Sequence, residues 1–395
     1  MPRVFPFEAL VYDVAVVGAL DRVTTPPYDV ISEMRRQEYR SEPFSIVQID
    51  LGTGDGEHRY LERDALLRRW VDEGVLVRTP PAFHAYEMRS SATGRVRGIF
   101  CAMELEDWGG DVMPHEETMA GPVEDRLRLL RATHTHLSAV YGTVVGPCPS
   151  LADLLDSVMA GPPDAELVDE QGVVHRRWTI AGDEPIGTWL YEEPLLIADG
   201  HHRYTTALAY RDEMRAASGP GPWDRLLTFV VDAGSERLSV QPFHRIQLSG
   251  TTPEPGRAIG DLDVVIGALS DDEPRVGIVR PNGADAELTV MDLAGEPPAV
   301  RALHDGLLDA LAPPGALRFT PDPVEAVAAV ERGEAVAAYL LPPTTTDRIR
   351  KVVERGERLP QKSTYFWPKP RTGVILMPLD DGSDPRSGLR RARAS

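Results

Sequence analysis

The stretch that decides the fold runs from Leu195 to Tyr210 and reads LLIADGHHRYTTALAY. Its first residues are apolar and predict a buried strand, and the residues after Gly200 predict a helix. A glycine at this junction permits a sharp turn and a close approach of the backbone to a ligand. The N–H groups and the dipole at the start of a helix attract anions, and Arg203 adds a forked donor suited to phosphate. The stretch therefore predicts a phosphate or nucleotide site.

By itself, a polar turn between a strand and a helix can also serve only capping or packing. The sequence DGHHRY at Asp199–Tyr204, however, resembles the signature of the DUF1015 family, which is similar to the ParB/sulfiredoxin superfamily and to its free-serine kinases. Four further stretches carry the same resemblance, and together they span almost the whole chain: PPYDVI at 26–31, HEET at 115–118, GPVEDRL at 121–127 and QKSTYFWPK at 361–369. The resemblance implies a ParB/sulfiredoxin-like core that binds a nucleotide.

Length and composition indicate a globular protein without a disulfide framework. The chain has 395 residues, enough for two or three cores or for one core with a large accessory lobe. Cys101 and Cys148 lie in no CxxC or Cys/His spacing, so we expect two buried thiols. No window approaches the roughly 18 consecutive apolar residues that span a bilayer, and the first residues lack the pattern of a secretory signal. We therefore expect a cytoplasmic protein that does not interact with membranes.

The charge balance argues against nucleic acid as a partner. The formal net charge is −19, which opposes the electrostatic attraction that drives most nucleic-acid binding. This matters because ParB relatives bind DNA. The one cationic cluster, RSGLRRARA at 386–394, follows an acidic, glycine-containing segment and is typical of a disordered tail rather than of a nucleic-acid arm.

The pattern of apolar residues predicts alternating strands and helices. We expect a strand at Phe44–Leu51, a helix at Tyr60–Glu73, and a hairpin formed by 82–88 and 96–105. A helix from Pro122 should place Leu127, Leu130, His134 and Leu137 on one face. On such a helix His134 and His136 face away from each other, so both should be structural or exposed rather than metal ligands.

These elements predict an α/β (α+β) fold with two lobes and a tail. Residues 1–250 should form the ParB/sulfiredoxin-like nucleotide-binding core. The proline-rich stretch Thr251–Pro255 marks a lobe boundary, and residues 256–378 should form an accessory C-terminal α/β lobe that returns a lysine-containing loop to the site. Residues 379–395 should be a disordered tail.

Departures from the superfamily patterns narrow the activities that the resemblance implies. Sulfiredoxin-like enzymes carry a reactive Cys before the His-Arg pair, whereas this chain has His201 there, so the thiolate chemistry lacks its nucleophile. ParB holds a nucleotide with a more basic loop and adds a helix-turn-helix, and neither is evident here. The remaining relative is a kinase that phosphorylates free serine at the expense of a nucleotide.

Phosphoryl transfer depends mainly on positioning and electrostatic stabilisation. A kinase site therefore needs phosphate-binding cations and a carboxylate that accepts the hydroxyl proton of the substrate. Asp199, Glu116 and Asp29 are the candidate bases, and Asp199 could instead orient a histidine or hold Mg²⁺. The predicted catalytic residues are Asp199, Glu116, His201 and His202, and the predicted nucleotide-binding residues are Gly200, His201, His202, Arg203, Tyr204, Thr205, Lys362, Ser363, Thr364 and Lys369. The predicted substrate-binding residues are Asp29, His115, Glu117 and Arg126.

Each of these segments also has a plainer interpretation. The HEET run can be a solvated face, and Arg126 can simply pair with carboxylates near Asp125 rather than bind the carboxylate of an amino acid. The aromatics at 365–367 can fill a core while Lys362 and Lys369 are exposed. In the functional interpretation, the two lysines lie against the Asp199–Arg203 loop and neutralise a nucleotide.

The sequence therefore predicts a nucleotide-dependent kinase of a small hydroxyl-bearing metabolite, with free L-serine as the leading acceptor. Its partners would be the nucleotide, ATP or ADP, with Mg²⁺, and the metabolite; CTP as donor stays open, as does the oligomeric state. The alternative is a ParB-like switch that binds or hydrolyses a nucleotide without phosphorylating a metabolite, and an inactive scaffold is a third possibility.

Overall fold

Two compact units make up the described part of the chain. The computed structural model describes residues 2–54, 56–116, 120–144, 147–190, 194–234, 236, 238–283 and 285–380, with only the backbone described at 120–122. Unit 1 comprises Met1–Met113, Thr118–Arg237 and Pro368–Ser395, and unit 2 comprises Pro114–Glu117 and Leu238–Trp367. The segment from Pro368 onward thus belongs to unit 1 although the residues directly before it, Leu238–Trp367, belong to unit 2.

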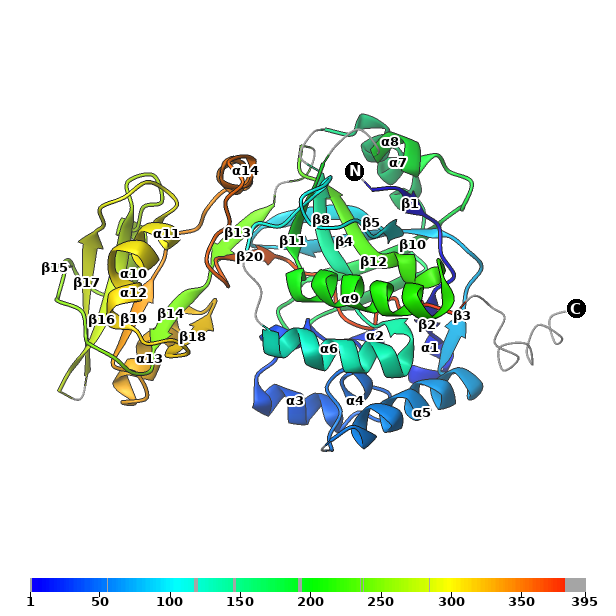
Figure 1. Cartoon of the computed structure of the whole chain (residues 1–395), viewed down its shortest axis with the longest axis horizontal. Coiled ribbons are helices and arrows are strands. Elements are labelled where there is room, and N and C mark those ends of the chain that lie inside the picture. Colours follow the sequence, from blue (N-terminus) through cyan, green and yellow to red (C-terminus); the bar gives the residue numbers. More distant parts are fainter. Residues whose placement is uncertain are drawn as a thin grey trace, which may run out of the picture. The chain divides into compact units, whose positions relative to one another are not determined.

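A mixed sheet forms the centre of unit 1 (Figure 1). Among the described residues its strand order is β6-β11-β8-β12-β5-β4-β10-β9, with β1 also paired to β5. Neighbours are antiparallel except for the parallel pairs β6/β11 and β8/β12. The bounds are β1 Val4–Phe5, β4 Phe83–Ser90, β5 Gly94–Glu104, β6 Val112–Met113, β8 Val140–Val144, β9 Ala165–Val168, β10 Val174–Ile180, β11 Leu195–Asp199 and β12 Arg225–Asp232. The central strand β5 is buried on both faces, as its nearly continuous apolar run requires.

Helices and short ribbons complete unit 1. Helix α9 lies across the sheet and packs against α6, and α5 packs on α6 in turn (Figure 1). The helical segments are α1 Val14–Val17, α2 Leu20–Val23, η1 Tyr28–Val30, α3 Glu33–Arg40, α4 Val47–Asp50, α5 His58–Asp72, α6 Ala120–Thr133, α7 Pro149–Met159, α8 Ile186–Leu190, α9 His201–Ser218 and η2 Pro222–Asp224. Two small ribbons pair β2 Leu10–Tyr12 with β3 Leu76–Arg78, and β7 Thr135–His136 with β21 Met377–Pro378.

Unit 2 is built on a second sheet with the strand order β15-β17-β16-β19-β14-β18, antiparallel throughout the described residues. Its core contains apolar residues of these strands and of α13. The bounds are β13 Ser239–Pro242, β14 His244–Gln247, β15 Arg257–Ala258, α10 Leu262–Ala268, β16 Arg275–Asn282, β17 Asp285–Asp292, α11 Ala299–Leu303, η3 His304–Leu308, α12 Asp309–Leu311, β18 Leu317–Thr320, α13 Pro323–Glu331, β19 Ala337–Leu340, α14 Thr346–Glu354 and β20 Thr364–Trp367. Strand β20 pairs with β13 in a ribbon.

The mixed α/β fold predicted from the sequence is confirmed, but two local predictions are wrong. The expected strand at Phe44–Leu51 contains helix α4 instead. Its residues Ile46, Val47 and Ile49 are fully buried, and a short apolar run of this kind fits either element.

The second wrong prediction concerns the end of helix α6. The helix ends at Thr133, whose hydroxyl donates to the carbonyl of Leu129 at 2.9 Å, and the next residue, His134, has a φ of 46°. His136 therefore lies in strand β7, buried, rather than on the helix. Within the described residues, no group of three or more His, Cys, Asp or Glu side chains could hold a metal ion.

Three further expectations concern the two cysteines, membrane-spanning helices and the C-terminal tail. Cys101 and Cys148 are both buried, as predicted, and neither forms a disulfide within the described part of the chain. Among the helices of the described residues, none has the length and apolar character needed to cross a bilayer. The residues beyond Asp380, which include most of the expected disordered tail, lie outside the described residues.

Candidate functional site

The DGHHRY motif forms the turn that its sequence predicts. Strand β11 ends at Asp199, Gly200 adopts the left-handed conformation (φ 98°, ψ 26°), and α9 begins at His201. The N-cap residue is this glycine, which has no side chain with which to cap the helix. The first amides of a helix have no partner within the helix, and over the 18 residues of α9 the dipole adds partial positive charge there. The turn is therefore chemically suited to bind an anion.

Asp199 lies at this turn between two largely buried cations. One carboxylate oxygen, Oδ2, accepts from Nη2 of Arg203, and the other, Oδ1, accepts from Nζ of Lys369. The exposed fractions of the side chains are 16% for Asp199, 12% for Arg203 and 4% for Lys369. Arg203 also donates to the Ser138 hydroxyl at 3.2 Å and to the carbonyl of Ala139. The two cations are thus held in fixed positions beside the start of α9.

A C-terminal segment of unit 1 brings Lys369 to this position. Thr372 and Thr25 exchange backbone hydrogen bonds of 2.8 and 3.1 Å, next to the PPYDVI motif. The buried guanidinium of Arg371 donates to the hydroxyl and the carbonyl of Thr24 and reaches Glu170 at 2.9 Å. These contacts fix the chain on both sides of Pro370. The structure therefore brings Lys369 against the Asp199 loop, although 170 positions separate the two residues in the sequence.

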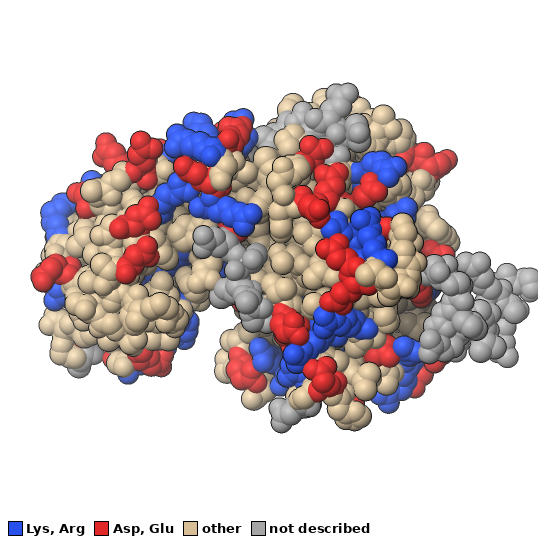
Figure 2. All heavy atoms as spheres, viewed as in Figure 1, with Lys and Arg blue, Asp and Glu red and all other residues tan. Residues whose placement is uncertain are grey.

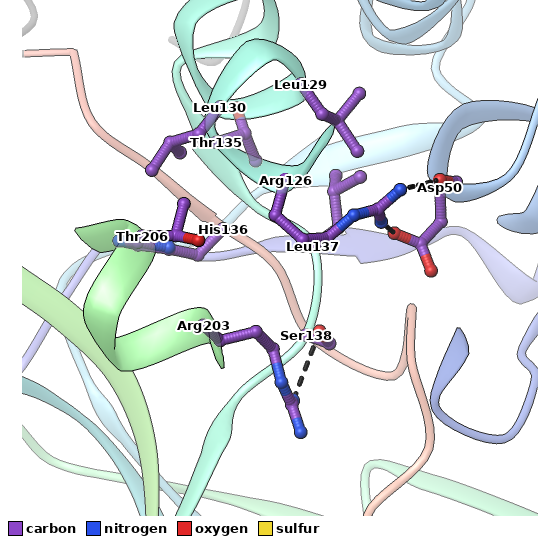
Figure 3. Close-up of a pocket in the computed structure, with 10 residues that line it drawn as sticks. All are labelled: Asp50, Arg126, Leu129, Leu130, Thr135, His136, Leu137, Ser138, Arg203 and Thr206. Carbon is purple, nitrogen blue, oxygen red and sulfur yellow. Dashed lines mark hydrogen bonds and ion pairs between the residues drawn. The ribbon is translucent and has the colours of Figure 1, made fainter. Parts of the chain in front are cut away.

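A small pocket, with a volume of about 50 Å³, extends from Arg203 toward α6 (Figure 3). Arg126 from α6 and Arg203 from α9 both line it, together with Asp50 and Thr206. Arg126 binds the carboxylate and the carbonyl of Asp50 at 2.6 and 3.0 Å. The second carboxylate oxygen of Asp50, Oδ2, is buried without a hydrogen-bond partner among the described residues. The pocket thus combines two arginines with an under-satisfied carboxylate.

Ion pairs and burial set the protonation of the groups in this pocket. Burial acts to lower the pKa of Arg126, but the charges of Asp50 and Asp125 outweigh it and raise that pKa above its usual value. Tyr28 of the PPYDVI motif stacks on the same guanidinium, with 4.7 Å from Cζ to the ring centroid. Burial lowers the pKa of His136 to about 4, so this imidazole is neutral at pH 7. Arg126 is therefore a fixed cation, held by carboxylates as the plainer interpretation of the sequence suggested.

The remaining residues of the motif face different surroundings. Tyr204 is buried, exchanges hydrogen bonds with the backbone of Glu106, and packs on Trp108. The hydroxyl oxygen of Thr205 is buried and has no hydrogen-bond partner among the described residues. His201 is buried and His202 is half-buried. Tyr204 thus anchors α9 in the core rather than facing the turn at which phosphate binding is predicted.

In unit 2, the QKST motif surrounds a carboxylate of the chain itself. Glu116 accepts from the amides of Lys362, Ser363 and Thr364 at 3.1, 3.0 and 2.7 Å, and from the Thr364 hydroxyl at 2.7 Å. Lys362 has a φ of 54°, and consecutive amides turned inward in this way form an anion-binding concavity. The amides that the sequence assigned to a nucleotide therefore bind Glu116.

Neighbouring residues of unit 2 fix this loop. The Nε2 atom of His115 lies 2.7 Å from the Thr364 hydroxyl, and its ring packs on Phe366. Arg245, fully buried, donates to the carbonyls of Lys362 and Gln361. Burial lowers the pKa of Arg245 to about 9. The aromatics Tyr365 and Phe366 are buried, as the structural interpretation of this segment expected.

The predicted site residues therefore fall into two groups, each described within its own unit. Asp199–Thr205, Arg126 and Lys369 belong to unit 1, as does Asp29, which is exposed in the short helix η1. His115, Glu116 and Lys362–Thr364 belong to unit 2. Glu117 lies outside the described residues.

Sequence reasoning missed Asp50, Ser138 and Arg371. Asp50 lies in the segment wrongly predicted as a strand, and Ser138 directly follows Leu137, the last residue placed on the predicted helix that in fact ends at Thr133. Arg371 follows the PKP run at 368–370 and could have been noted as a third cation in that segment.

Comparisons with known proteins agree with the family resemblance. The family described as "Protein of unknown function (DUF1015)" matches residues 4–262. No curated protein matches the sequence. Among solved structures, a conserved hypothetical protein from Pyrococcus furiosus is 14% identical, with a TM-score of 0.35 over 68% of this chain and 90% of that chain. A free serine kinase in complex with AMP is 14% identical, with a TM-score of 0.37 over 68% and 86%. SbnI with a C-terminal truncation, from Staphylococcus aureus, is 10% identical, with a TM-score of 0.37 over 69% and 85%.

Proposed function

The chain belongs to the DUF1015 family, and from the geometry of its α9 turn we propose that it is a nucleotide-dependent kinase of a small hydroxyl-bearing metabolite, with free L-serine as the leading acceptor. The observation that carries the proposal is the arrangement at Asp199. An arginine and a buried lysine both bind this carboxylate, directly before a helix whose N-cap residue is glycine. Phosphoryl transfer needs such a set of positive groups around a proton acceptor.

The nucleotide phosphates would bind to the amides at the start of α9 and to Arg203 and Lys369. Both cations are already oriented by Asp199, so little conformational entropy would be lost when a phosphate takes them over. When bound, the nucleotide supplies the phosphoryl group. Its negative charge would compete with Asp199 for the two cations and leave a carboxylate oxygen able to accept the proton of the attacking hydroxyl.

Of the three candidate bases, Asp199 has the surroundings that best fit this role. Glu116 accepts four hydrogen bonds from the loop at 362–364, and these contacts favour a structural role. Asp29 is exposed in η1, where water competes for its lone pairs. Asp199 combines partial burial with two cations suited to phosphate.

Of the described residues at the turn, one carboxylate could take part in binding Mg²⁺. Mg²⁺ is commonly held by one or two carboxylates together with substrate phosphates and water rather than by a protein cage. Asp199 is the carboxylate at the turn that could serve as its ligand. His201 and His202 would then act as donors near the transferred group, and Arg126 would bind the carboxylate of the amino acid only if it gave up contacts with Asp50.

A screen of donors against acceptors tests the proposal. ATP, ADP and CTP are each combined with L-serine and other hydroxyl metabolites, and the phosphorylated product is detected by mass spectrometry. We expect product with at least one donor and, for Asp199→Asn, a loss on the order of 10²–10⁴-fold in turnover with nucleotide binding retained. Asp212→Asn, an exposed position on the same helix, is the matched control and should retain full turnover.

If the protein hydrolyses the nucleotide at a rate indifferent to every added metabolite, the kinase proposal is overturned in favour of the switch. A folded Asp199→Asn protein with undiminished turnover would retain the kinase but exclude Asp199 as its base.

A further inference from the structure

A second pocket of unit 1 lies between the end of α3, the connection from α4 to α5, and α5 itself. Its volume is about 550 Å³. Four arginines line it, Arg40, Arg59, Arg63 and Arg69, against a single carboxylate, Glu62. An excess of positive charge at one site is unusual in a chain whose formal net charge is −19. Figure 2 shows acidic and basic side chains interspersed over the visible face, without a continuous basic surface.

Arg63 is the deepest of these arginines. The residue is only 5% exposed, and its Nη2 donates to the carbonyl of Gly52 at 2.6 Å. Its Nε and Nη1 atoms are also buried, but neither has a hydrogen-bond partner in the part of the chain that the structure describes. Burying donors of a charged group without partners is costly, so these N–H groups call for an acceptor.

Arg40 and Arg59 repeat this arrangement at the rim. Nη2 of Arg40 donates to the carbonyl of Leu51 at 2.6 Å, and Nη2 of Arg59 donates to the Tyr60 hydroxyl at 2.5 Å and to Asp125 at 3.0 Å. The Nε atom of each is buried and lacks a hydrogen-bond partner among the described residues. In each of these arginines, Nη2 is fixed by hydrogen bonds to the protein, whereas the N–H group of Nε lacks an acceptor among the described residues.

The nearby carboxylates do not satisfy these donors. Asp125 binds Arg126 as well as Arg59, and Asp50 also binds Arg126. Glu33 is 3.8 Å from Arg40, and Glu62 pairs with His58. Burial lowers the pKa of Arg63, and repulsion from Arg126 lowers it further. The cluster therefore retains more positive charge than its own carboxylates neutralise.

We propose that this pocket, lined by Arg40, Arg59 and Arg63, binds a small multivalent oxyanion that carries phosphate or carboxylate groups. Guanidinium groups donate in pairs to either kind of oxyanion. Because Arg63 lies deep in the pocket, only a small molecule can reach it. A membrane surface or a nucleic-acid backbone is therefore excluded as the occupant. None of the lining residues belongs to the α9 turn, so the site is separate from the one assigned to the nucleotide.

The test is calorimetric titration of the full-length protein with pyrophosphate and with citrate, which represent the two oxyanion chemistries. The protein carries Arg203→Ala, which weakens the proposed phosphate site at α9. We expect saturable binding of at least one probe. Added to this background, Arg40→Gln and Arg59→Gln should each weaken it about tenfold or more, because a charge-assisted contact is lost. Arg68→Gln is the matched control, because Arg68 is exposed on the same helix and lies outside the pocket.

Arg63→Met should abolish the binding, and the two rim variants carry the test if this buried substitution prevents folding. Stronger binding of pyrophosphate than of citrate would assign the site to phosphates, and the reverse would assign it to carboxylates. The proposal is overturned if neither probe binds, if the rim variants bind as well as the background protein, or if Arg68→Gln weakens binding equally. Because the readout is binding, none of these results depends on kinase activity.

Discussion

Replacing Gly200 with alanine should weaken both folding and nucleotide binding, for separable reasons. The residue has a φ of +98°, and a left-handed conformation costs an L-amino acid roughly 1–2 kcal/mol. A Cβ atom at this position would also lie 3.0 Å from Nε and 3.1 Å from Cζ of Arg203. The guanidinium must then shift by a few tenths of an ångström, which weakens the charge-assisted contact that we propose it makes with a phosphate. Complete loss of that contact, worth about 1.5–3 kcal/mol, would make the affinity for ADP or ATP roughly ten- to hundredfold weaker, and this is the upper bound of the expected effect.

Gly74→Ala is the matched control for this experiment. Gly74 also has a positive φ, +74°, but nothing lies within 4 Å of an added Cβ. Urea denaturation should show a loss of stability for both variants, larger for Gly200→Ala because of the added contact with Arg203, whereas calorimetric titration with nucleotide should show weaker binding for Gly200→Ala alone. Equal nucleotide affinity in the two folded variants would refute the role assigned to the Arg203 guanidinium.

Three further predictions concern the packing and protonation of the two units. Burial, followed by the charge of Arg177, lowers the pKa of His84 from 6.5 to about 3, so the unfolded chain takes up this proton first and stability falls as the pH drops below 6.5. His84→Phe should therefore reduce the stability lost between pH 7 and pH 5 by about 2 kcal/mol, and an unchanged pH dependence in urea denaturation would count against it. Glu116→Gln should destabilise unit 2 by about 1–3 kcal/mol, visible as faster hydrogen exchange of the amides at 362–364, and exchange at the parent rate would show that the carboxylate does not hold this loop. Phe229→Ala, at a fully buried position of the sheet in unit 1, should cost about 3–5 kcal/mol in urea denaturation, and a loss below 1 kcal/mol would contradict the packing described.

Local patterns in the sequence predicted the central elements of unit 1. The apolar run before Asp199, the glycine after it and the helical spacing beyond correctly predicted β11, the turn and α9. The hairpin of β4 and β5 was predicted in the same way. These elements are specified by residues close together in the chain, so their signals can be read without tertiary structure.

Contacts between distant segments of the chain determine those features of the fold and the site that local sequence patterns could not predict. Whether the apolar residues at 44–51 form a strand or a helix depends on burial of Ile46, Val47 and Ile49, which the rest of unit 1 provides. No spacing in the sequence indicates that Asp50 pairs with Arg126, or that Glu116 occupies the amides at 362–364. The approach of Lys369 to the Asp199 loop was expected from charge balance, but its tether through Arg371 and Thr24 was not.

The central claim is that the start of α9 binds the phosphates of a nucleotide with the help of Arg203. Calorimetric titration of ADP and ATP into the parent protein, Arg203→Ala and Arg215→Ala tests it most directly, because Arg215 is an exposed arginine at the other end of the same helix. We expect Arg203→Ala to bind both nucleotides roughly ten- to hundredfold more weakly and Arg215→Ala to bind them as well as the parent protein does. Equal affinity in all three folded proteins, or no binding of either nucleotide to the parent, would contradict it.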